Sequence, residues 1–202
     1  MSCLNNIDCV ILAGGYGTRL NLDIPKVMAT IDGRPFLSIL LERLRKFGAR
    51  KIILSLGYQS QFVIRYLRDN KPEGLRIISC IEPYPVGTLY GLNNVQRMTR
   101  SKLVMVMNGD TLVDVDLCSF VSNHKEAGTQ ASVLRDLDNV STGIYLFSQI
   151  ALNYISNLPG NSLEDILPMI PTYTSKMNCP FLDIGTPDDL EQATTFIKKM
   201  KT

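Results

Sequence analysis

A glycine-rich turn near the start of the chain is flanked by two cations. Residues 12–26 read LAGGYGTRLNLDIPK and directly follow the apolar run IDCVI. Successive backbone amides in such a turn can point at an anion, and Arg19 and Lys26 add two positive charges at its rim. These residue types favour a phosphate-binding loop. A tight strand-to-helix turn that merely needs glycines is the alternative.

The spacing of the glycines fits neither of the two best-known phosphate signatures. A P-loop requires GxxxxGK followed by Ser or Thr, and the sequence contains no such stretch. A dinucleotide fingerprint begun at Gly15 and Gly17 would need a third glycine where Leu20 stands. We therefore expect Gly14, Gly15 and Gly17 to hold phosphates in another way, through their backbone amides.

The elements that must position this loop alternate between strands and helices. Apolar, strand-like runs occupy 7–15, 51–57, 75–82 and 102–110, and helical patterns occupy 34–48, 60–70, 88–98 and 116–128. Such alternation predicts right-handed βαβ units and an α/β fold with a Rossmann-like, mostly parallel sheet flanked by helices.

Three turns rich in glycine and polar residues fall where predicted strands end. They lie at 14–19, 82–88 and 108–110. In sheets of this kind the ligand binds beyond the carboxyl ends of the strands. The sequence therefore predicts that these three turns meet in one binding site.

The pattern changes after about residue 130. Two short strand-like runs, QASVLRD and TGIYLFS, are separated only by the polar stretch LDNVS. A short helix is expected in SLEDILPMI, a late strand in MNCPFLDIG and a closing helix in PDDLEQATTFIKKM. No repeat or linker interrupts the chain, so we expect a single domain over 1–202.

Four motifs, in their order along the chain, resemble the sugar-1-phosphate nucleotidyltransferases. They are LAGGYGTRL with IPK, then IEPYPVGTLYGL, then MNGDTLVDVDL, and finally SLEDILP with FLDIGTPDDL. The later motifs are most similar to those of the D-glycero-D-manno-heptose 1-phosphate guanylyltransferases. The resemblance implies the nucleotide-diphospho-sugar transferase type of fold, with a nucleotide-binding half at 1–130 and a sugar and metal half at 131–202.

The reaction that this resemblance implies needs little acid–base chemistry. An oxygen of a sugar 1-phosphate attacks the α-phosphorus of a nucleoside triphosphate in line, and pyrophosphate leaves. The attacking phosphate is largely ionised near neutrality, since its second pKa is about 6. The barrier lies in bringing anions together, a task for positioning, cations and Mg²⁺.

The family resemblance assigns catalytic roles to four residues. Arg19 would grip the triphosphate, and Lys26 would contact phosphate near the reacting centre. Asp110 and Asp183 would hold Mg²⁺, which prefers a few carboxylate oxygens with phosphate and water. Surface salt bridges and turn-forming aspartates are the alternatives. Asp114 and Asp116 are expected to cap a helix or to face solvent.

Glu82 would read the base. A carboxylate only accepts hydrogen bonds, and guanine N1–H and its exocyclic amine are two adjacent donors; a strand-end glutamate in solvent is the alternative. Gly87 and Thr88 would let the backbone approach the base, and Asn108 and Gly109 would shape the ribose and metal turn. The nucleotide-binding set is then Leu12, Ala13, Gly14, Gly15, Gly17, Thr18, Arg19, Glu82, Gly87, Thr88, Asn108 and Gly109.

The sugar half departs from the family pattern. Gly143 and Glu164 correspond to sugar-binding positions of the family. For Glu164, a glutamate in the first turn of a helix capped by Ser162 is an equally good interpretation. The family's longer excursion before TGIYLFS, with a lysine that contacts the sugar phosphate, has no counterpart here. Ser141 stands where the family has asparagine. A shortened sugar-binding region is therefore expected.

Three functions remain open from the sequence. The first joins a nucleotide, with GTP favoured, to a sugar 1-phosphate, with heptose 1-phosphate favoured. The second is a cytidylyl- or uridylyltransferase with another phosphorylated acceptor. The third is a nucleotide-binding paralogue with weakened catalysis. The short sugar region is compatible with a small or unusual phosphate acceptor, with a site completed by another subunit, or with a weakened enzyme.

Composition restricts the partners and the compartment. A net charge of +2 gives no reason to expect a nucleic-acid partner, and no apolar stretch approaches a membrane span. Without a signal peptide, the chain is expected in the cytoplasm, with its five cysteines reduced and mostly buried.

A cluster of basic residues is interpreted as a solvated helix face; it comprises Arg43, Arg45, Lys46, Arg50 and Lys51. A homo-oligomer is one option for the chain's assembly.

Overall fold

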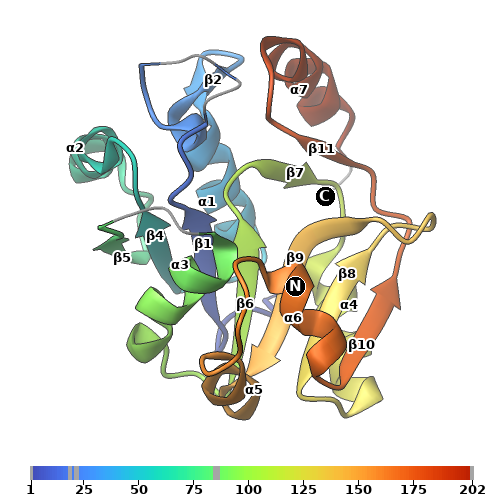
Figure 1. Cartoon of the computed structure of the whole chain (residues 1–202). Coiled ribbons are helices and arrows are strands. Elements are labelled where there is room, and N and C mark those ends of the chain that lie inside the picture. Colours follow the sequence, from blue (N-terminus) through green and yellow to red (C-terminus); the bar gives the residue numbers. More distant parts are fainter. Residues whose placement is uncertain (1, 18–19, 21–22, 84–86, 201–202) are drawn as a thin grey trace.

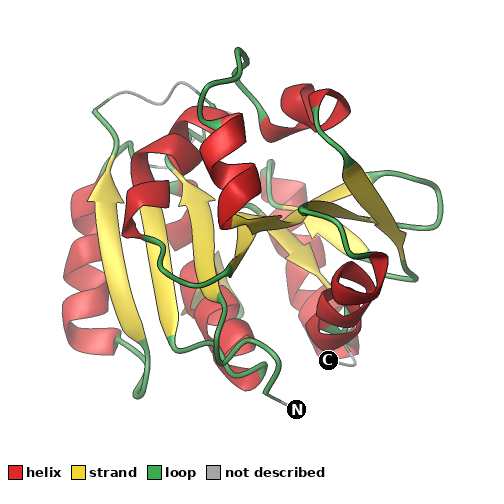
Figure 2. Ribbon diagram, turned by 90° about the horizontal axis from the view of Figure 1, so that it is seen from below, coloured by secondary structure: helices red, strands yellow, loops and turns green. Residues whose placement is uncertain are grey.

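A seven-stranded sheet forms the centre of the molecule and carries helices on both faces (Figures 1 and 2). The computed structural model describes residues 2–17, 20, 23–83 and 87–200. The strand order is β10-β8-β9-β6-β1-β4-β5. β9 runs antiparallel to both of its neighbours, and the other pairings are parallel. The predicted mostly parallel, Rossmann-like sheet is confirmed.

The strands of this sheet are β1 (Asp8–Ala13), β4 (Lys51–Leu56), β5 (Arg76–Ile81), β6 (Leu103–Asn108), β8 (Ala131–Arg135), β9 (Ser141–Ser148) and β10 (Thr172–Lys176). Two small antiparallel ribbons join β2 (Thr30–Ile31) to β3 (Arg34–Pro35) and β7 (Thr111–Val113) to β11 (Phe181–Asp183). The helices are α1 (Phe36–Lys46), α2 (Ser60–Asn70), α3 (Thr88–Val95), α4 (Leu117–Ala127), α5 (Gln149–Ile155), α6 (Leu163–Ile166) and α7 (Pro187–Lys199), with short 3₁₀ turns η2 (Lys26–Met28), η3 (Gln96–Met98) and η4 (Leu167–Met169).

Two apolar cores hold the layers together, one on each face of the sheet. Alternate side chains of a strand enter different cores: Ile52 and Leu54 of β4 pack with α1 and α2, whereas Ile53 packs with α3. Central strands buried on both faces need apolar residues at every position. This requirement explains the mostly apolar runs from which β1, β4 and β6 were predicted.

Short or polar elements were not predicted. The ribbon strands β2, β3 and β7 have two or three residues each, too few for a periodic pattern. β10, with the sequence TYTSK, lies at the edge of the sheet and buries only Ser175. β10 pairs with β8, and β9 pairs with β6, so one continuous sheet spans both halves of the chain.

The expectation of a solvated basic helix face is wrong for Arg43 and Lys51. Arg43 is 8% exposed and donates to the carbonyl oxygen of Val115 at 2.7 Å. Burial lowers its pKa to about 10, and nearby Asp114 partly opposes that shift. Helical spacing could not show that α1 buries this arginine against the segment before α4.

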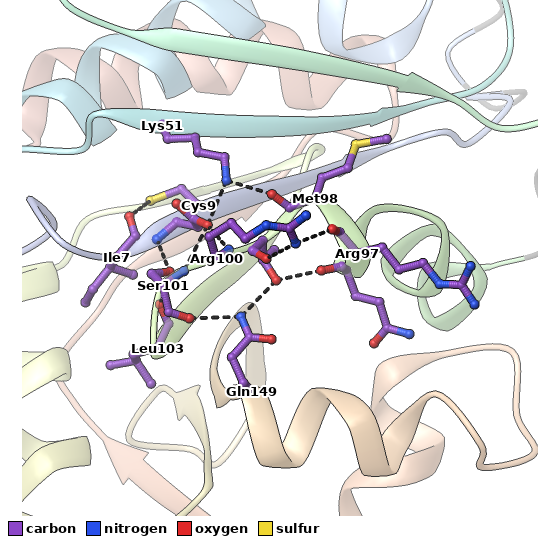
Figure 3. A network of polar contacts seen from close by, with 12 residues as sticks. Ile7, Cys9, Lys51, Arg97, Met98, Arg100, Ser101, Leu103 and Gln149 are labelled. Carbon is purple, nitrogen blue, oxygen red and sulfur yellow. Dashed lines mark hydrogen bonds and ion pairs between the residues drawn. The ribbon is translucent and has the colours of Figure 1, made fainter.

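Lys51 belongs to a polar network at the amino ends of the strands (Figure 3). Its ammonium donates to Asp8 Oδ2 at 2.9 Å and to the carbonyl of Met98 at 2.6 Å. The Asp8 carboxylate also accepts from the backbone amides of Arg100 and Ser101. These four hydrogen bonds fix the strand ends opposite the predicted site, so this network has a structural role.

The expectation of five reduced cysteines is wrong for two of them. Cys3 and Cys118 form a disulfide, with their Cα atoms 5.4 Å apart. The two residues are 115 positions apart in the sequence, and only the packing of the N-terminus beside α4 brings them together. Cys9, Cys80 and Cys179 are free, and Cys9 and Cys179 are buried as expected.

Reducing the disulfide is expected to lower the free energy of unfolding by about 2–4 kcal/mol, because a cross-link over a long loop restricts the unfolded chain. Urea denaturation of oxidised protein, reduced protein and Cys3→Ser measures the effect. Cys80→Ser, which removes a free thiol, is the matched control. Coincident midpoints for oxidised and reduced protein would show that the cross-link adds nothing.

In the described part of the chain, no helix is long and apolar enough to cross a membrane.

Candidate functional site

The predicted turns meet at the carboxyl edge of the sheet. The amide of Gly109 donates to the carbonyl of Leu12 at 2.8 Å, which joins the turn after β6 to the glycine loop after β1. A cavity of about 110 Å³ opens beside them and is lined by Leu12, Gly14, Gly15, Glu82, Gly87, Thr88 and Gly91. Six of these seven residues belong to the predicted nucleotide-binding set. Thr18 and Arg19 lie outside the described residues.

Glu82 forms one wall of this cavity and is only 6% exposed. The alternative of a strand-end glutamate in solvent is therefore wrong. The hydroxyl of Ser55 donates to Glu82 Oε1 at 2.6 Å. Burial raises the pKa of Glu82, and the Ser55 hydrogen bond opposes that shift.

The Glu82 carboxylate fits only because glycines surround it. A Cβ on Gly14 would lie 2.5 Å from Glu82 Oε1 and 2.7 Å from Oε2. A Cβ on Gly91, in α3, would lie 2.9 Å from Oε1. The glycine loop thus does more than turn the chain, because it makes room for a buried carboxylate.

Ser55, Gly57 and Gly91 are functional candidates that the sequence analysis missed. Ser55 is fully buried and lies within hydrogen-bond distance of both Glu82 Oε1 and the Gly91 carbonyl. Gly57 packs so closely on the carbonyl of Gly14 that a side chain would collide with it. A polar serine inside the apolar run KIILSL was the available signal for Ser55.

Asp110 and Asp183 come together through the ribbon β7–β11. Asp183 pairs with Thr111 in this ribbon, and the amide of Ile184 donates to the Asp110 carbonyl at 2.7 Å. The Thr111 hydroxyl lies 2.6 Å from Asp183 Oδ1 and 3.3 Å from Asp110 Oδ1. Both aspartates lie at the predicted edge, but Asp183 reaches it from a separate ribbon rather than from a strand of the main sheet.

Lys26 connects the glycine loop to this pair of carboxylates. Its ammonium lies 2.9 Å from Asp110 Oδ2, and its side chain is 15% exposed. A Cβ on Gly17 would lie 3.1 Å from the Lys26 Cβ. A cation and two carboxylates therefore stand directly beside the glycine loop. Asp116, by contrast, caps α4 as expected by accepting from the amide of Cys118.

Gly143, one of the two residues predicted to bind sugar, lies next to the turn at 108–110 that was predicted to hold the metal. Gly143 has a φ of +70°, and a Cβ there would lie 2.5 Å from Asn108 Nδ2. Asn108 Oδ1 is buried and has no hydrogen-bond partner among the described residues. A buried acceptor without a partner is uncommon in folded proteins, which makes Asn108 a candidate for contact with a ligand.

Glu164 does not pair with Ser162, the residue that caps the N-terminus of α6. Asp165 forms the capping box with Ser162 instead. The Glu164 carboxylate accepts from Arg135 Nη2 at 2.8 Å, from the Ser141 hydroxyl at 2.6 Å and from the Tyr145 hydroxyl at 2.8 Å. Three donors from β8 and β9 thus fix this carboxylate at the sugar side of the edge.

The shortened segment is a tight hairpin between β8 and β9. The amide of Asp136 donates to the carbonyl of Val140 at 3.0 Å, and the Asp136 carboxylate accepts from the Val140 amide. Asn139 occupies the left-handed region with a φ of +68°. The connection between β8 and β9 is therefore short, as the sequence indicated, and its effect on the sugar-binding region stays a prediction.

Comparison with known proteins agrees with this geometry. The family model described as the MobA-like NTP transferase domain matches residues 9–168. A D-glycero-alpha-D-manno-heptose 1-phosphate guanylyltransferase of Aneurinibacillus thermoaerophilus is 30% identical, over 93% of this chain and 96% of its own. The enzyme of the same name from Campylobacter jejuni is 28% identical, over 91% of this chain and 96% of its own.

A solved structure extends the similarity to the fold. The crystal structure of HddC from Yersinia pseudotuberculosis, complexed with GMP-PN, superposes with a TM-score of 0.80 at 28% identity, covering 95% of this chain and 99% of that one. The fold is therefore that of the nucleotide-diphospho-sugar transferases. With its sheet, its glycine loop and the matched residues, the chain belongs to the MobA-like NTP transferase domain family.

Proposed function

We propose that this protein transfers GMP from GTP to a heptose 1-phosphate and releases pyrophosphate. The observation that carries the proposal is the buried Glu82 carboxylate, which walls a cavity that the glycine loop also lines. Lys26 and the Asp110–Asp183 pair stand on the other side of that loop's turn, at the same edge of the sheet. The Glu82 carboxylate only accepts hydrogen bonds and therefore complements the two donors of guanine, its N1–H and its exocyclic amine. The name of HddC's ligand, GMP-PN, and the names of the two heptose 1-phosphate guanylyltransferases support this choice.

In this proposal each loop at the edge binds one part of the nucleotide. The backbone of Gly14, Gly15 and Gly17 binds phosphate oxygens, with Thr18 and Arg19 completing the loop. Ala13, Gly87 and Thr88 flank the base, while Asn108 and Gly109 contact the ribose. Charge on the triphosphate is thereby spread over amides and cations that need no reorganisation during the reaction.

Lys26 is proposed to act at the reacting phosphate. Its ammonium is held 2.9 Å from Asp110 and is mostly shielded from water. A shielded cation stabilises charge that develops at the α-phosphorus more strongly than an exposed one. The sugar phosphate arrives already ionised, so the protein positions it and removes no proton from it.

The carboxylates of Asp110 and Asp183 fit a magnesium ion. Both lie within reach of one hydroxyl, that of Thr111, and both have exposed oxygen atoms on the same edge. Mg²⁺ takes one or two carboxylates and completes its shell with phosphate and water. When bound, the ion would neutralise phosphate charge and orient the reacting oxygens.

A pyrophosphate-release panel tests the proposal. Purified protein with Mg²⁺ receives each nucleoside triphosphate against several sugar 1-phosphates, including D-glycero-D-manno-heptose 1-phosphate and mannose 1-phosphate. We expect turnover with GTP and heptose 1-phosphate. Turnover with CTP or UTP but not with GTP would overturn the base assignment. Nucleotide binding without turnover on any acceptor would identify a non-catalytic paralogue.

As the pH falls, GTP binding is expected to weaken, and this loss should begin at a higher pH than an exposed glutamate would cause. Only ionised Glu82 accepts both guanine donors. Because burial raises its pKa, Glu82 takes up a proton at a higher pH than an exposed glutamate does. Affinity is therefore lost as the pH falls through that raised pKa.

Titration of GTP binding against pH measures this effect, with Glu82→Gln as the reference that lacks the ionisable group. The difference between the two profiles removes the contribution of the phosphates themselves. Parallel profiles for the two proteins would refute the titration of Glu82.

A further inference from the structure

At the sugar side, an ion pair joins Glu164, a predicted sugar-binding residue, to Arg135, an arginine that the proposed reaction has not used. Arg135 ends β8, and its Nη2 lies 2.8 Å from Glu164 Oε2. The Arg135 side chain is 21% exposed and the Glu164 side chain 40%, so the pair is reachable from solvent. Nη1 of Arg135 donates to the carbonyl of Asn139 in the hairpin at 3.0 Å. The short hairpin thus fixes the guanidinium from one side and Glu164 fixes it from the other.

The pair retains unused hydrogen-bonding capacity of both kinds. A guanidinium has five N–H donors and a carboxylate about four acceptor sites. Arg135 uses two donors, to Asn139 and Glu164. Glu164 uses three acceptor sites, for Arg135, Ser141 and Tyr145. Within the described part of the chain, three donors and one acceptor site therefore stay open side by side.

The location of the pair sets which part of an acceptor can reach it. β8 is separated from β6, which ends at the metal turn, by β9 alone. Neighbouring strands lie about 4.8 Å apart, so β8 is about 10 Å from β6. The amide of Leu163 donates to the Thr88 hydroxyl at 2.9 Å, which anchors the start of α6 on the nucleotide cavity. An acceptor whose phosphate lies at the metal turn would extend the far end of its sugar ring toward Arg135 and Glu164.

We propose that the Arg135–Glu164 pair reads the exocyclic glycol of a heptose acceptor and makes Arg135 a specificity-determining residue. The inference rests on the proposed function, whose acceptor class it sharpens. One hydroxyl of a vicinal diol donates to the open site on Glu164, and its neighbour accepts from the guanidinium. Mannose 1-phosphate has a single exocyclic hydroxyl and satisfies only one half of the pair.

Charge explains why an ion pair, rather than a lone residue, suits this place. A glutamate alone would repel an anionic sugar phosphate, whereas a carboxylate neutralised by arginine does not. The fork of the guanidinium also fixes the direction of its remaining donors, which the single ammonium of lysine would not. Ser141, at the position where asparagine was expected, contributes by donating to the same carboxylate.

The test compares two acceptors in two assays. The ratio of kcat/KM for heptose 1-phosphate to that for mannose 1-phosphate is measured at saturating GTP, and calorimetric binding of both sugar phosphates is measured in parallel. For Arg135→Lys and Glu164→Gln we expect this ratio to fall by about tenfold or more, with the KM for GTP unchanged. Arg68→Lys, on the outer surface of α2 beside Asp69, is the matched control and should keep the wild-type ratio.

The outcomes separate this inference from the proposed function. Equal losses on both acceptors in Arg135→Lys, or an unchanged ratio, would overturn the role of the pair while leaving the enzyme a guanylyltransferase. A binding preference for heptose 1-phosphate that Arg135→Lys abolishes, in a protein without turnover, would support the pair and overturn the proposed reaction. Thermal unfolding of each variant checks that the folded state is retained.

Discussion

Asp110→Asn is expected to lower metal-dependent turnover by a factor on the order of 10²–10³ and to leave the fold intact. The substitution keeps the shape of the side chain and removes its charge. Asp110 is one of two carboxylates that approach the Thr111 hydroxyl, and it is the partner of Lys26. Its loss would weaken Mg²⁺ binding and release the lysine from its position at the same time.

Turnover at several Mg²⁺ concentrations measures this effect, together with thermal unfolding of the variant. Asp69→Asn, which neutralises an exposed aspartate on α2, is the matched control. Wild-type turnover in Asp110→Asn would refute the assigned metal role. A large fall in thermal stability would instead show that the Lys26–Asp110 pair supports the fold.

Glu82→Gln is expected to lower kcat/KM for GTP by about 100-fold, and to lower it far less for the other nucleotides. The amide keeps the volume that Gly14 and Gly91 accommodate, so the cavity retains its shape. The amide's NH₂ group, however, faces a donor of guanine and cannot accept from it. The loss therefore falls on the base that requires two acceptors.

Kinetics of the four nucleoside triphosphates with one acceptor would measure this preference. Glu73→Gln, an exposed glutamate outside the site, is the matched control. Equal losses for all four nucleotides would mean that Glu82 supports the cavity without reading the base.

The sequence predicted the central strands and the principal helices because burial on both faces imposes a pattern on the residues themselves. β1, β4 and β6 are mostly apolar runs, and the α2 pattern matches its observed bounds of Ser60–Asn70. β10 could not be found in this way. It lies at an edge, where polar residues are tolerated and no periodicity distinguishes a strand from a loop.

The candidate site was predictable in its parts and less so in its assembly. The glycine loop, Glu82 and Asp110 follow strands that end at one edge, so their meeting follows from the topology. The burial of Glu82 depends on Ser55 and Gly91, which come from two other elements. The Arg135–Glu164 pair spans 29 residues and a short hairpin, and the Cys3–Cys118 disulfide spans 115. Contacts of that range leave no periodic trace in a sequence.

Phosphorus NMR of one reaction mixture shows whether the protein transfers GMP to the sugar phosphate. The protein is incubated with GTP, D-glycero-D-manno-heptose 1-phosphate and Mg²⁺. Transfer of GMP predicts that the three GTP signals are replaced by those of free pyrophosphate and of a sugar-linked diphosphate, in equal amounts, while the heptose 1-phosphate signal disappears. Release of inorganic phosphate with formation of GDP, or an unchanged spectrum alongside bound GTP, would contradict the account.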